Sequence, residues 1–343
     1  MADRHRATPR RTLESRWRLR YALGLSLLIA GASAAEPVAA PGFAALAART
    51  REEPADFSVT TYNVKGLPWP IAEGRPDALR RIGARLAQMR AAGRQPQVVV
   101  LQEAFTPEAK AIGDRAGYPY QVEGPYLRSA PGERRETGGV WYLGETGGSA
   151  LDSGLVVLSD FPVTAVARAA FPTGACAGYD CLAAKGVVMV TLDVPGRGPV
   201  TVAATHLNSR GASGAPPART HAAYRRQTAF LAEFLARNRV GGEPVILAGD
   251  FNRGDRPVRI AALAAAFGSA REGLSETLRD AAAPAPDAKL IQRRGRDMQL
   301  LFDGTATHLE TAGADVPFGT ERNGTMLSDH LGFTVRYRLV PRT

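Results

Sequence analysis

The stretch Val245-Ile246-Leu247-Ala248-Gly249-Asp250-Phe251-Asn252 joins a short apolar run to a polar end that contains a carboxylate and a carboxamide. The run Val245–Ala248 has the length and composition of a buried strand. If the extended backbone continues, the period of two points the side chains of Asp250 and Asn252 in the same direction. Such a pair can hold a water and a phosphate oxygen together. A turn in which Asp250 bonds its own backbone is the structural alternative.

Four further polar motifs follow or precede apolar runs in a similar way. They are Thr61-Tyr62-Asn63-Val64, Leu101-Gln102-Glu103, Thr205-His206-Leu207-Asn208 and Ser328-Asp329-His330. Any one of them is also compatible with an ordinary strand end and a polar turn. Together, the five motifs supply carboxylates, carboxamides and two imidazoles, a set suited to metal-assisted hydrolysis of a phosphate ester.

Glu103 follows the strongly apolar run Val98–Leu101. A carboxylate at the end of a buried strand is costly to bury without a partner, and a divalent cation is an effective partner. Asn63 ends another predicted strand and offers a neutral oxygen to the same ion. A cap and a surface carboxylate are the structural alternatives for these two residues.

Histidine is the usual proton carrier near neutral pH. Residues 35–343 contain four histidines, and two of them, His206 and His330, lie inside the motifs. Asp329 and His330 are adjacent, so they can serve one site together only where the chain bends locally. His221 and His308 lack such a context, and we assign them no role.

Apolar runs alternate with two helical patterns from residue 57 onward. The helical patterns cover Asp77–Ala92 and His221–Asn238, and the strand candidates are Phe57–Asn63, Val98–Leu101, Gly154–Ser159, Gly186–Val194, Val200–Thr205, Val245–Ala248, Met298–Phe302 and Phe333–Leu339. This alternation predicts sheets packed face to face and covered by helices on the outside. We expect mobile loops at Ser209–Pro217 and Glu133–Gly148.

The N-terminal segment has the pattern of a targeting sequence. Seven arginines within the first twenty residues precede the short apolar run Tyr21–Ala30, and Ala32-Ser33-Ala34 is a small-x-small cleavage site. This pattern predicts a secretory signal peptide over residues 1–34 and hence a secreted or periplasmic protein. An anchoring N-terminal helix is the alternative. Residues 35–56 are rich in Ala and Pro, and we expect them to form a flexible lead-in.

The net charge divides unevenly along the chain. Residues 1–34 carry +5 of the formal net charge of +10, because their seven arginines outnumber Asp3 and Glu14. The remaining net charge of +5 predicts a weak preference for an anionic partner. No apolar stretch reaches the about 18 residues that a membrane-spanning helix needs.

Cys176 and Cys181 are the only cysteines. In an exported protein the oxidising compartment favours a disulfide between them, whereas in a reducing compartment they stay as thiols. So short a loop removes little chain entropy, so the bond would pin a surface loop rather than hold the fold together.

The ordered motifs resemble those of the endonuclease/exonuclease/phosphatase superfamily, which includes deoxyribonucleases, abasic-site endonucleases, inositol polyphosphate phosphatases and bacterial sphingomyelinases. The resemblance covers about Phe57 to Leu339, and its most specific parts are Gly249–Asn252 and Ser328–His330. It implies a catalytic domain over residues 57–343 with an α/β fold, a four-layer sandwich of two packed mixed β-sheets flanked by helices. It also implies a site at one end of the sheets and a requirement for Mg²⁺ or Mn²⁺.

The resemblance assigns each motif residue a role. The implied catalytic residues are His206, Asp250, Asn252, Asp297 and His330, the implied metal ligands are Asn63, Glu103 and Asp329, and the implied substrate-binding residues are Asn208 and Lys185. Asp250 orients or activates the water, Asn252 binds the phosphate, and His330 stabilises a phosphorane-like transition state. Asp297 orients His330, although Met298 stands where the family usually has an aromatic residue.

Two features bear on the substrate that the resemblance implies. A histidine at position 206 is typical of deoxyribonuclease-like and sphingomyelinase-like members, and the segments Asp152–Ser159 and Cys181–Gly186 are similar to segments of sphingomyelinases. We therefore expect a secreted phosphodiesterase that hydrolyses a phospholipid head group or another small diester, with DNA or RNA as the alternative substrate. A catalytically silent binding module on the same fold is the alternative of another class.

The two substrate classes require different surfaces. A nuclease needs a basic groove, and the candidate residues are Arg210, Arg219, Arg225, Arg226, Arg293, Arg294 and Arg296. An enzyme in peripheral contact with a membrane needs exposed apolar side chains beside its site, and the candidates are Trp69, Trp141, Tyr142 and Phe318. We expect a monomer, and nothing in the sequence implies a protein partner.

Overall fold

The computed structural model describes residues 56–126, 139–146, 148–239, 241–280, 285–321 and 323–342. The expected signal peptide over residues 1–34 and nearly all of the expected lead-in lie outside the described residues, as do residues 133–138 and 147 of the expected loop Glu133–Gly148.

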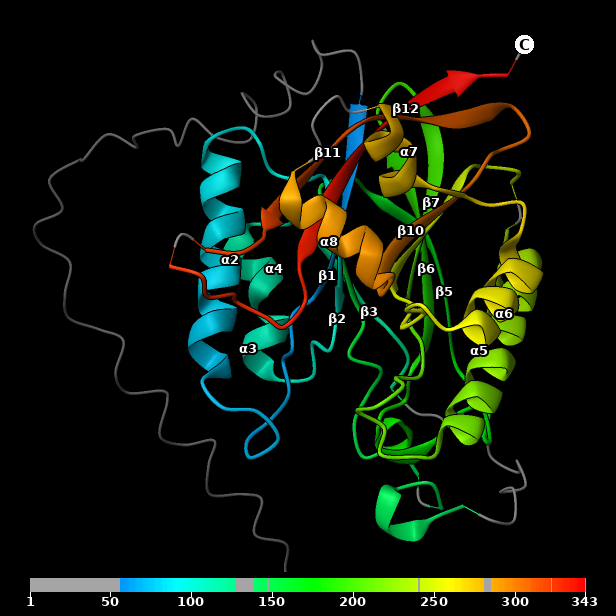
Figure 1. Cartoon of the computed structure of the whole chain (residues 1–343). Coiled ribbons are helices and arrows are strands. Elements are labelled where there is room, and N and C mark those ends of the chain that lie inside the picture. The colour runs from blue at the N-terminus through cyan, green and yellow to red at the C-terminus, as the bar shows by residue number, and fades with distance from the viewer. Residues whose placement is uncertain are drawn as a thin grey trace, which may run out of the picture. The chain divides into compact units, whose positions relative to one another are not determined.

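The described strands form two six-stranded sheets with both parallel and antiparallel neighbours (Figure 1). The first sheet has the order β11 (Thr307–Phe318), β12 (Gly332–Pro341), β1 (Asp56–Asn63), β2 (Val98–Gln102), β4 (Val156–Ser159) and β3 (Tyr120–Glu123). The second has the order β5 (Val163–Ala170), β6 (Gly186–Val194), β7 (Gly198–His206), β8 (Val245–Asp250), β10 (Asp297–Phe302) and β9 (Arg271–Glu272).

The central strands bury both of their faces, which explains their nearly continuous apolar sequences. In β8, Ile246 and Ala248 point into the core between the sheets, whereas Val245 and Leu247 point outward beneath helices. The same alternation in the other sheet directs Val98 and Val100 inward. Removing a fully buried aliphatic side chain from water contributes about 1.5–3 kcal/mol, so this alternation fixes the register of each central strand.

Helices cover the outer face of each sheet. On the first sheet lie α2 (Arg75–Ala91), α3 (Pro107–Lys110) and α4 (Ile112–Ala116), and on the second lie α5 (Pro217–Asn238) and α6 (Pro257–Phe267). The short helices α7 (Gly273–Asp280) and α8 (Pro286–Arg294) connect β9 to β10 and contact β11. The order helix, sheet, sheet, helix confirms the predicted four-layer α/β sandwich.

Most predicted elements are present with ends that differ by a few residues. The helix expected from His221 begins at Pro217, because proline fits the first turn of a helix, where no backbone N–H is needed. The expected loop Ser209–Pro217 is correspondingly shorter. Among the described residues, no helix combines the length and the apolar content needed to span a membrane.

The topology brings the sequence motifs to one end of the sandwich. β1 and β2 run parallel, as do β7 and β8, so the motifs that follow these four strands meet at one edge. β10 runs antiparallel to β8, and its first residue, Asp297, lies opposite Asp250. β12 runs antiparallel to β1, so His330, just before it, lies beside the end of β1. Six sequence segments therefore converge on one site.

Candidate active site

Asp297 and His330 form a buried pair at the start of β10 and before β12. The Nδ1 atom of His330 lies 2.8 Å from Oδ2 of Asp297, and its Nε2 atom lies 3.7 Å from Oδ2 of Asp250. Burial alone would lower the pKa of His330, but Asp297 and Asp250 outweigh it and raise the pKa to about 10. Burial raises the pKa of Asp297, with His330 opposing. The imidazolium therefore faces Asp250 from a fixed orientation at neutral pH.

The local bend that His330 requires is present. The hydroxyl of Ser328 donates to the backbone oxygen of Asn63 over 2.7 Å and accepts from the backbone N–H of His330 over 3.3 Å. Asp329 and His330 consequently both line the same cavity. Asp329 is half exposed, and its carboxylate pairs with Lys65 over 3.2 Å.

Glu103, Asn63 and Asp250 bring oxygen atoms together at the interface of the two sheets. The amide nitrogen of Asn63 donates to Glu103 over 3.0 Å and to Asp250 over 3.2 Å. Burial raises the pKa of Glu103, with the hydrogen bond from Asn63 opposing. Glu103 also has a left-handed backbone, with φ of 55°. This conformation is uncommon for residues with a side chain and often marks a functional position.

A divalent cation fits this group. Two carboxylates, Glu103 and Asp250, flank one amide, and Glu103 forms no ion pair with any described residue. Carboxylate and amide oxygens are the ligands that Mg²⁺ prefers. Asn63 now directs its oxygen at the backbone N–H of Lys65, over 3.1 Å, so its participation requires the amide to turn over.

A second group of possible ligand atoms belongs to Asp250, Asp297 and His330, which lie within 4.8 Å of one another. Both ring nitrogens of His330 already face carboxylates there, so mutual ion pairing accounts for this group. We therefore place the candidate metal site at Glu103 and not at the imidazole.

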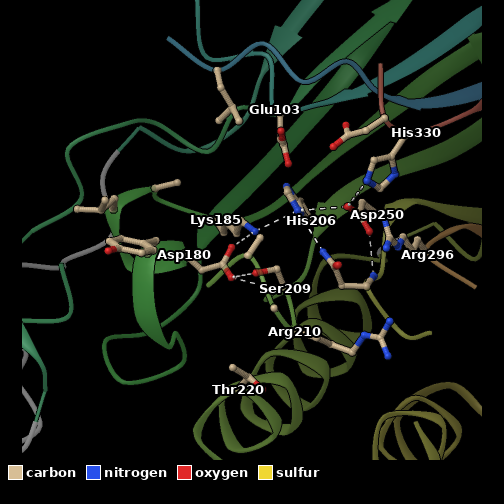
Figure 2. A pocket seen from close by; sticks show the side chains of 18 of the residues that line it. Glu103, Asp180, Lys185, His206, Ser209, Arg210, Thr220, Asp250, Arg296 and His330 are labelled. Atoms are coloured by element: carbon tan, nitrogen blue, oxygen red, sulfur yellow. Dashed lines mark hydrogen bonds and ion pairs between the residues drawn. The ribbon is translucent and has the colours of Figure 1, made fainter. Parts of the chain in front are cut away.

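His206 is the neutral counterpart of His330. Its pKa is lowered to about 3 by burial and by the charge of Lys185. Because the Lys185 ammonium can only donate, Nε2 of His206, 3.0 Å away, accepts, and Nδ1 carries the proton. That Nδ1 atom is buried without a hydrogen-bond partner among the described residues, and His206 is one of the residues that line the cavity (Figure 2).

Lys185 is held in turn by Asp180. The two side chains form a buried ion pair, and Asp180 also accepts hydrogen bonds from the backbone N–H and the hydroxyl of Ser209. Burial would raise the pKa of Asp180, but Lys185 outweighs it and lowers the pKa. Lys185 is one of the residues that line the cavity, and its binding of substrate stays a prediction.

The Asp250–Asn252 segment combines the local turn with side chains that both reach the site, the two geometries that the sequence allows. β8 ends at Asp250, and the extended backbone does not continue, because Asn252 is left-handed with φ of 47°. Oδ1 of Asp250 accepts from the backbone N–H of Asn252 over 2.9 Å, which is the local turn. Even so, the Asn252 amide reaches Nε2 of His206 at 3.3 Å, and both side chains line the cavity.

Gly249, between strand and turn, has φ of 153°, and a Cβ atom there would collide with the carbonyl group of Thr205. The backbones of β7 and β8 can therefore approach closely enough to align His206 with Asp250, as their register requires.

Asn208 does not take the position expected of a substrate-binding residue. Its side chain is fully buried, accepts from the backbone N–H of Ala177 over 2.9 Å and donates to the carbonyl of Ser209 over 2.8 Å. The carboxamide thus ties two loops together and is absent from the lining of the cavity.

Arg259 of α6 was not identified from the sequence. It is fully buried, stacks on the ring of Tyr224 and donates to the carbonyl groups of Asn208 and Asn252 over 2.6 and 2.9 Å. It therefore joins the loops after β7 and β8. An arginine in a helical pattern usually indicates a solvated face, so the sequence carries no signal for this role.

The cysteines form the disulfide Cys176–Cys181, as predicted for an exported protein. The bond closes a short loop that contains Asp180 and leads into the cavity wall at Leu182 and Ala183. It pins a loop, in agreement with the sequence interpretation, and that loop borders the site.

The site residues open into one cavity of about 1070 Å³. Seven of the predicted site residues line it, namely Glu103, Lys185, His206, Asp250, Asn252, Asp329 and His330. The lining does not include Asn63, Asn208 or Asp297. Its apolar lining includes Leu67, Ile71, Phe105, Leu151 and Leu182. The arrangement offers carboxylates for a cation, one protonated and one neutral imidazole, and an apolar surface for part of a substrate.

Comparison with known proteins agrees with this geometry. The family model described as "Endonuclease/Exonuclease/phosphatase family" matches residues 60–330, most of the chain. The chain belongs to the endonuclease/exonuclease/phosphatase family. A comparison with curated proteins gives no match. Members of this family share the phosphodiesterase fold, and the coarse assignment to phosphoester hydrolases rests on that membership.

Several solved structures of the family share the fold of this chain. Sphingomyelinase C from Streptomyces griseocarneus has a TM-score of 0.56 and 22% identity, covering 82% of this chain and 99% of that one. Beta toxin from Staphylococcus aureus with bound magnesium ions has a TM-score of 0.56 and 16% identity, with the same coverage. TDP2 from D. rerio with a single-strand DNA product has a TM-score of 0.55 and 13% identity, covering 83% and 99%.

Proposed function

We propose that the chain is a secreted or periplasmic, Mg²⁺-dependent phosphodiesterase that hydrolyses the head-group diester of a phospholipid. The observation that carries the reaction is the placement of Asp250, which faces His330 over 3.7 Å and shares the amide of Asn63 with Glu103. A phosphate in the cavity would thus meet a cation-binding carboxylate and an imidazolium at once.

A bound Mg²⁺ would neutralise phosphate charge, and Glu103, with Asn63 after its amide turns, would hold it. Burial alone would raise the pKa of Asp250, but the charge of His330 outweighs it and lowers the pKa. Asp250 is therefore an ionised carboxylate that can orient a water and accept its proton.

The two histidines act on the phosphate oxygens as donors. His330 supplies a positive charge whose orientation Asp297 fixes, and charge developing on the phosphorane is stabilised without reorganisation. His206 adds a neutral Nδ1–H donor, and the Asn252 amide lies 3.3 Å from its other ring nitrogen, Nε2. We assign Asp329, which pairs with Lys65 at the rim, to substrate or metal approach.

The apolar surface around the cavity supports a lipid substrate. Trp69 is 79% exposed and Trp141 is 77% exposed, and Ile71 and Tyr142 are exposed beside them. Ile71 lines the cavity, and η1 (Trp141–Leu143) contacts η2 (Gly178–Leu182), which forms part of its wall. Both segments project from the end of the sheets that carries the site (Figure 1). Phe318, the remaining candidate, is 2% exposed and stacks on Tyr62, so it belongs to the core.

Interfacial binding draws on apolar side chains that leave water, and tryptophan and tyrosine suit the boundary between lipid and water. A peripheral contact through these two segments would place the cavity mouth at the membrane surface. The alternative, a nucleic acid substrate, would draw on basic residues.

The test of the proposed function is hydrolysis of bis(p-nitrophenyl) phosphate and of phospholipid vesicles, each with Mg²⁺ and with chelator. We expect release of nitrophenol and of the phosphorylated head group with Mg²⁺ alone. A Trp69→Ser/Trp141→Ser double variant should keep the rate on the soluble diester and lose rate on vesicles. Equal, negligible rates on all diesters with and without Mg²⁺ would favour the binding module.

A further inference from the structure

We propose, building on the proposed function, that the substrate is a phospholipid whose head group carries a second anionic group, such as a second phosphate, and that Arg210, Arg256 and Arg296 bind it. These three arginines line the cavity on the side of the loops after β7 and β8. This subsite adds a substrate preference to the reaction and selects against a cationic choline head group.

The structure distinguishes these arginines from the others near the motifs. Arg219 is paired with Glu145, and Arg226 donates to the carbonyl of Gly174, so neither lies on the cavity wall. Arg210 and Arg296 do line it, and Arg256, which the sequence interpretation did not select, joins them. A guanidinium presents a planar fork that matches phosphate oxygens, and this makes arginine a common phosphate ligand.

The backbone places Arg210 close to Arg296. The guanidinium of Arg210 lies over Gly254, within about 3 Å of where a Cβ atom would stand. The N–H of Gly254 donates to the carbonyl of Gly295, the neighbour of Arg296, over 2.9 Å. Figure 2 draws the side chains of Arg210 and Arg296 among those that line the pocket. We call Arg210, Arg256 and Arg296 the basic wall of the cavity.

This wall has more positive charge than its carboxylates neutralise. Asp255 lies 3.0 Å from Arg210 and 3.6 Å from Arg256, so one exposed carboxylate serves both. Arg296 forms no ion pair with any described residue. Asp180 and Lys185 also line the cavity, and because they form an ion pair with each other, they add no net charge to it. The basic wall consequently favours an anion, and a quaternary ammonium beside it would be repelled.

The pKa of His221 reflects the positive charge of the same arginines. His221 lines the cavity next to this wall, and its pKa is lowered by burial and by Arg259, Arg225, Arg256 and Arg210. The apolar residues of the lining are Leu67, Ile71, Phe105, Leu151 and Leu182, and four of these five are aliphatic. A molecule with one apolar arm and one additional anion matches both sets of residues, and the aliphatic side chains suit a lipid chain.

The test separates binding from hydrolysis. Calorimetric titrations at fixed Mg²⁺ compare inositol 1,4-bisphosphate, inositol 1-phosphate and phosphocholine on the inactive His330→Ala variant. We expect the bisphosphate to bind about three- to tenfold more tightly than the monophosphate, and phosphocholine to bind most weakly. Adding Arg256→Gln or Arg296→Gln should reduce the preference for the bisphosphate and leave the affinity for inositol 1-phosphate unchanged.

Arg237→Gln is the matched control, because Arg237 is exposed on α5 and its loss changes the net charge equally. Equal affinities for both inositol phosphates, or an equal effect of Arg237→Gln, would overturn the subsite. These titrations need no turnover, so a failure of the subsite is distinguishable from a failure of the proposed hydrolysis.

Hydrolysis by the active enzyme then identifies the source of the anion. Vesicles that contain phosphatidylinositol 4-phosphate should be hydrolysed faster than vesicles with phosphatidylinositol, and vesicles with sphingomyelin slowest. Rapid cleavage of a DNA oligonucleotide that falls steeply with salt, with every vesicle left intact, would overturn the lipid assignment.

Discussion

Replacing Asp297 with asparagine tests whether the charge of His330 depends on its buried partner. The rise of the His330 pKa from 6.5 to about 10 corresponds to roughly 5 kcal/mol in favour of the imidazolium. Asp297, 2.8 Å from Nδ1, contributes more than Asp250. We therefore expect Asp297→Asn to lower the pKa of His330 by about two pH units.

The sign of the effect on stability follows from the same pKa. Because the pKa of His330 is raised in the folded chain, protonation of this imidazole stabilises the fold. The contribution is complete below about pH 6.5 and is lost as the pH rises towards 10. Asp297→Asn should remove most of that contribution. It should also move the alkaline limit of kcat to lower pH by the same amount as the His330 pKa.

The measurement is an NMR titration of histidine-labelled protein, combined with a pH profile of kcat. Asp193→Asn, an exposed carboxylate on β6, is the control for the chemical change and should leave both quantities unchanged. An unaltered His330 pKa in Asp297→Asn would refute the reasoning, because the pair would then not be the cause of the raised value.

Three further predictions follow from other contacts. Glu103→Gln should raise the Mg²⁺ concentration needed for half-maximal activity by about tenfold or more. His330→Ala should instead lower kcat by about 10²–10⁴-fold and leave that Mg²⁺ concentration unchanged. Mg²⁺ titrations that rescue both variants equally would contradict this division of roles. The pKa of Asp180 is lowered, so its stabilising effect is present above about pH 3.8 and is lost as the pH falls through the folded-state pKa. Urea unfolding from pH 6 to pH 3 should show this loss in the wild type and not in Asp180→Asn. The variant leaves Lys185 without its carboxylate partner, at an expected cost of about 3–5 kcal/mol. N-terminal sequencing of exported protein should begin near Ala35 or Glu36, and an intact Met1 on a cytoplasmic product would exclude the signal peptide.

The sequence predicts the central strands well, because their side chains are buried on both faces and their apolar runs are nearly continuous. The edge strands escape prediction for the opposite reason. β5 is rich in Ala and largely exposed, and β11 contains Glu310, Gly313 and Asp315, so neither has a regular apolar pattern. Their extended conformation comes from pairing with a neighbouring strand and not from their own composition.

The same distinction applies to the site. The motif residues can be identified because each follows a predictable strand, and parallel strands bring such ends together. Asn208 has the same spacing from His206 as Asn252 from Asp250, yet it turns into the protein and holds loops. Arg256 and Arg259 act through loops whose paths depend on tertiary contacts. Local spacing contains no information about those paths.

The position of β12 has a consequence for when the proposed active site can assemble. This strand is among the last residues of the chain, but it lies between β11 and β1, inside the first sheet. His330 immediately precedes it, and Asn63 closes β1 beside it. A ribosome-bound chain that lacks residues 330–341 therefore has neither a complete first sheet nor the imidazolium of His330. The proposed hydrolysis requires that these residues have been synthesised and have inserted beside β1. If the chain is exported unfolded, as the proposed signal peptide would allow, this order of synthesis would keep the proposed activity away from the cell that makes it.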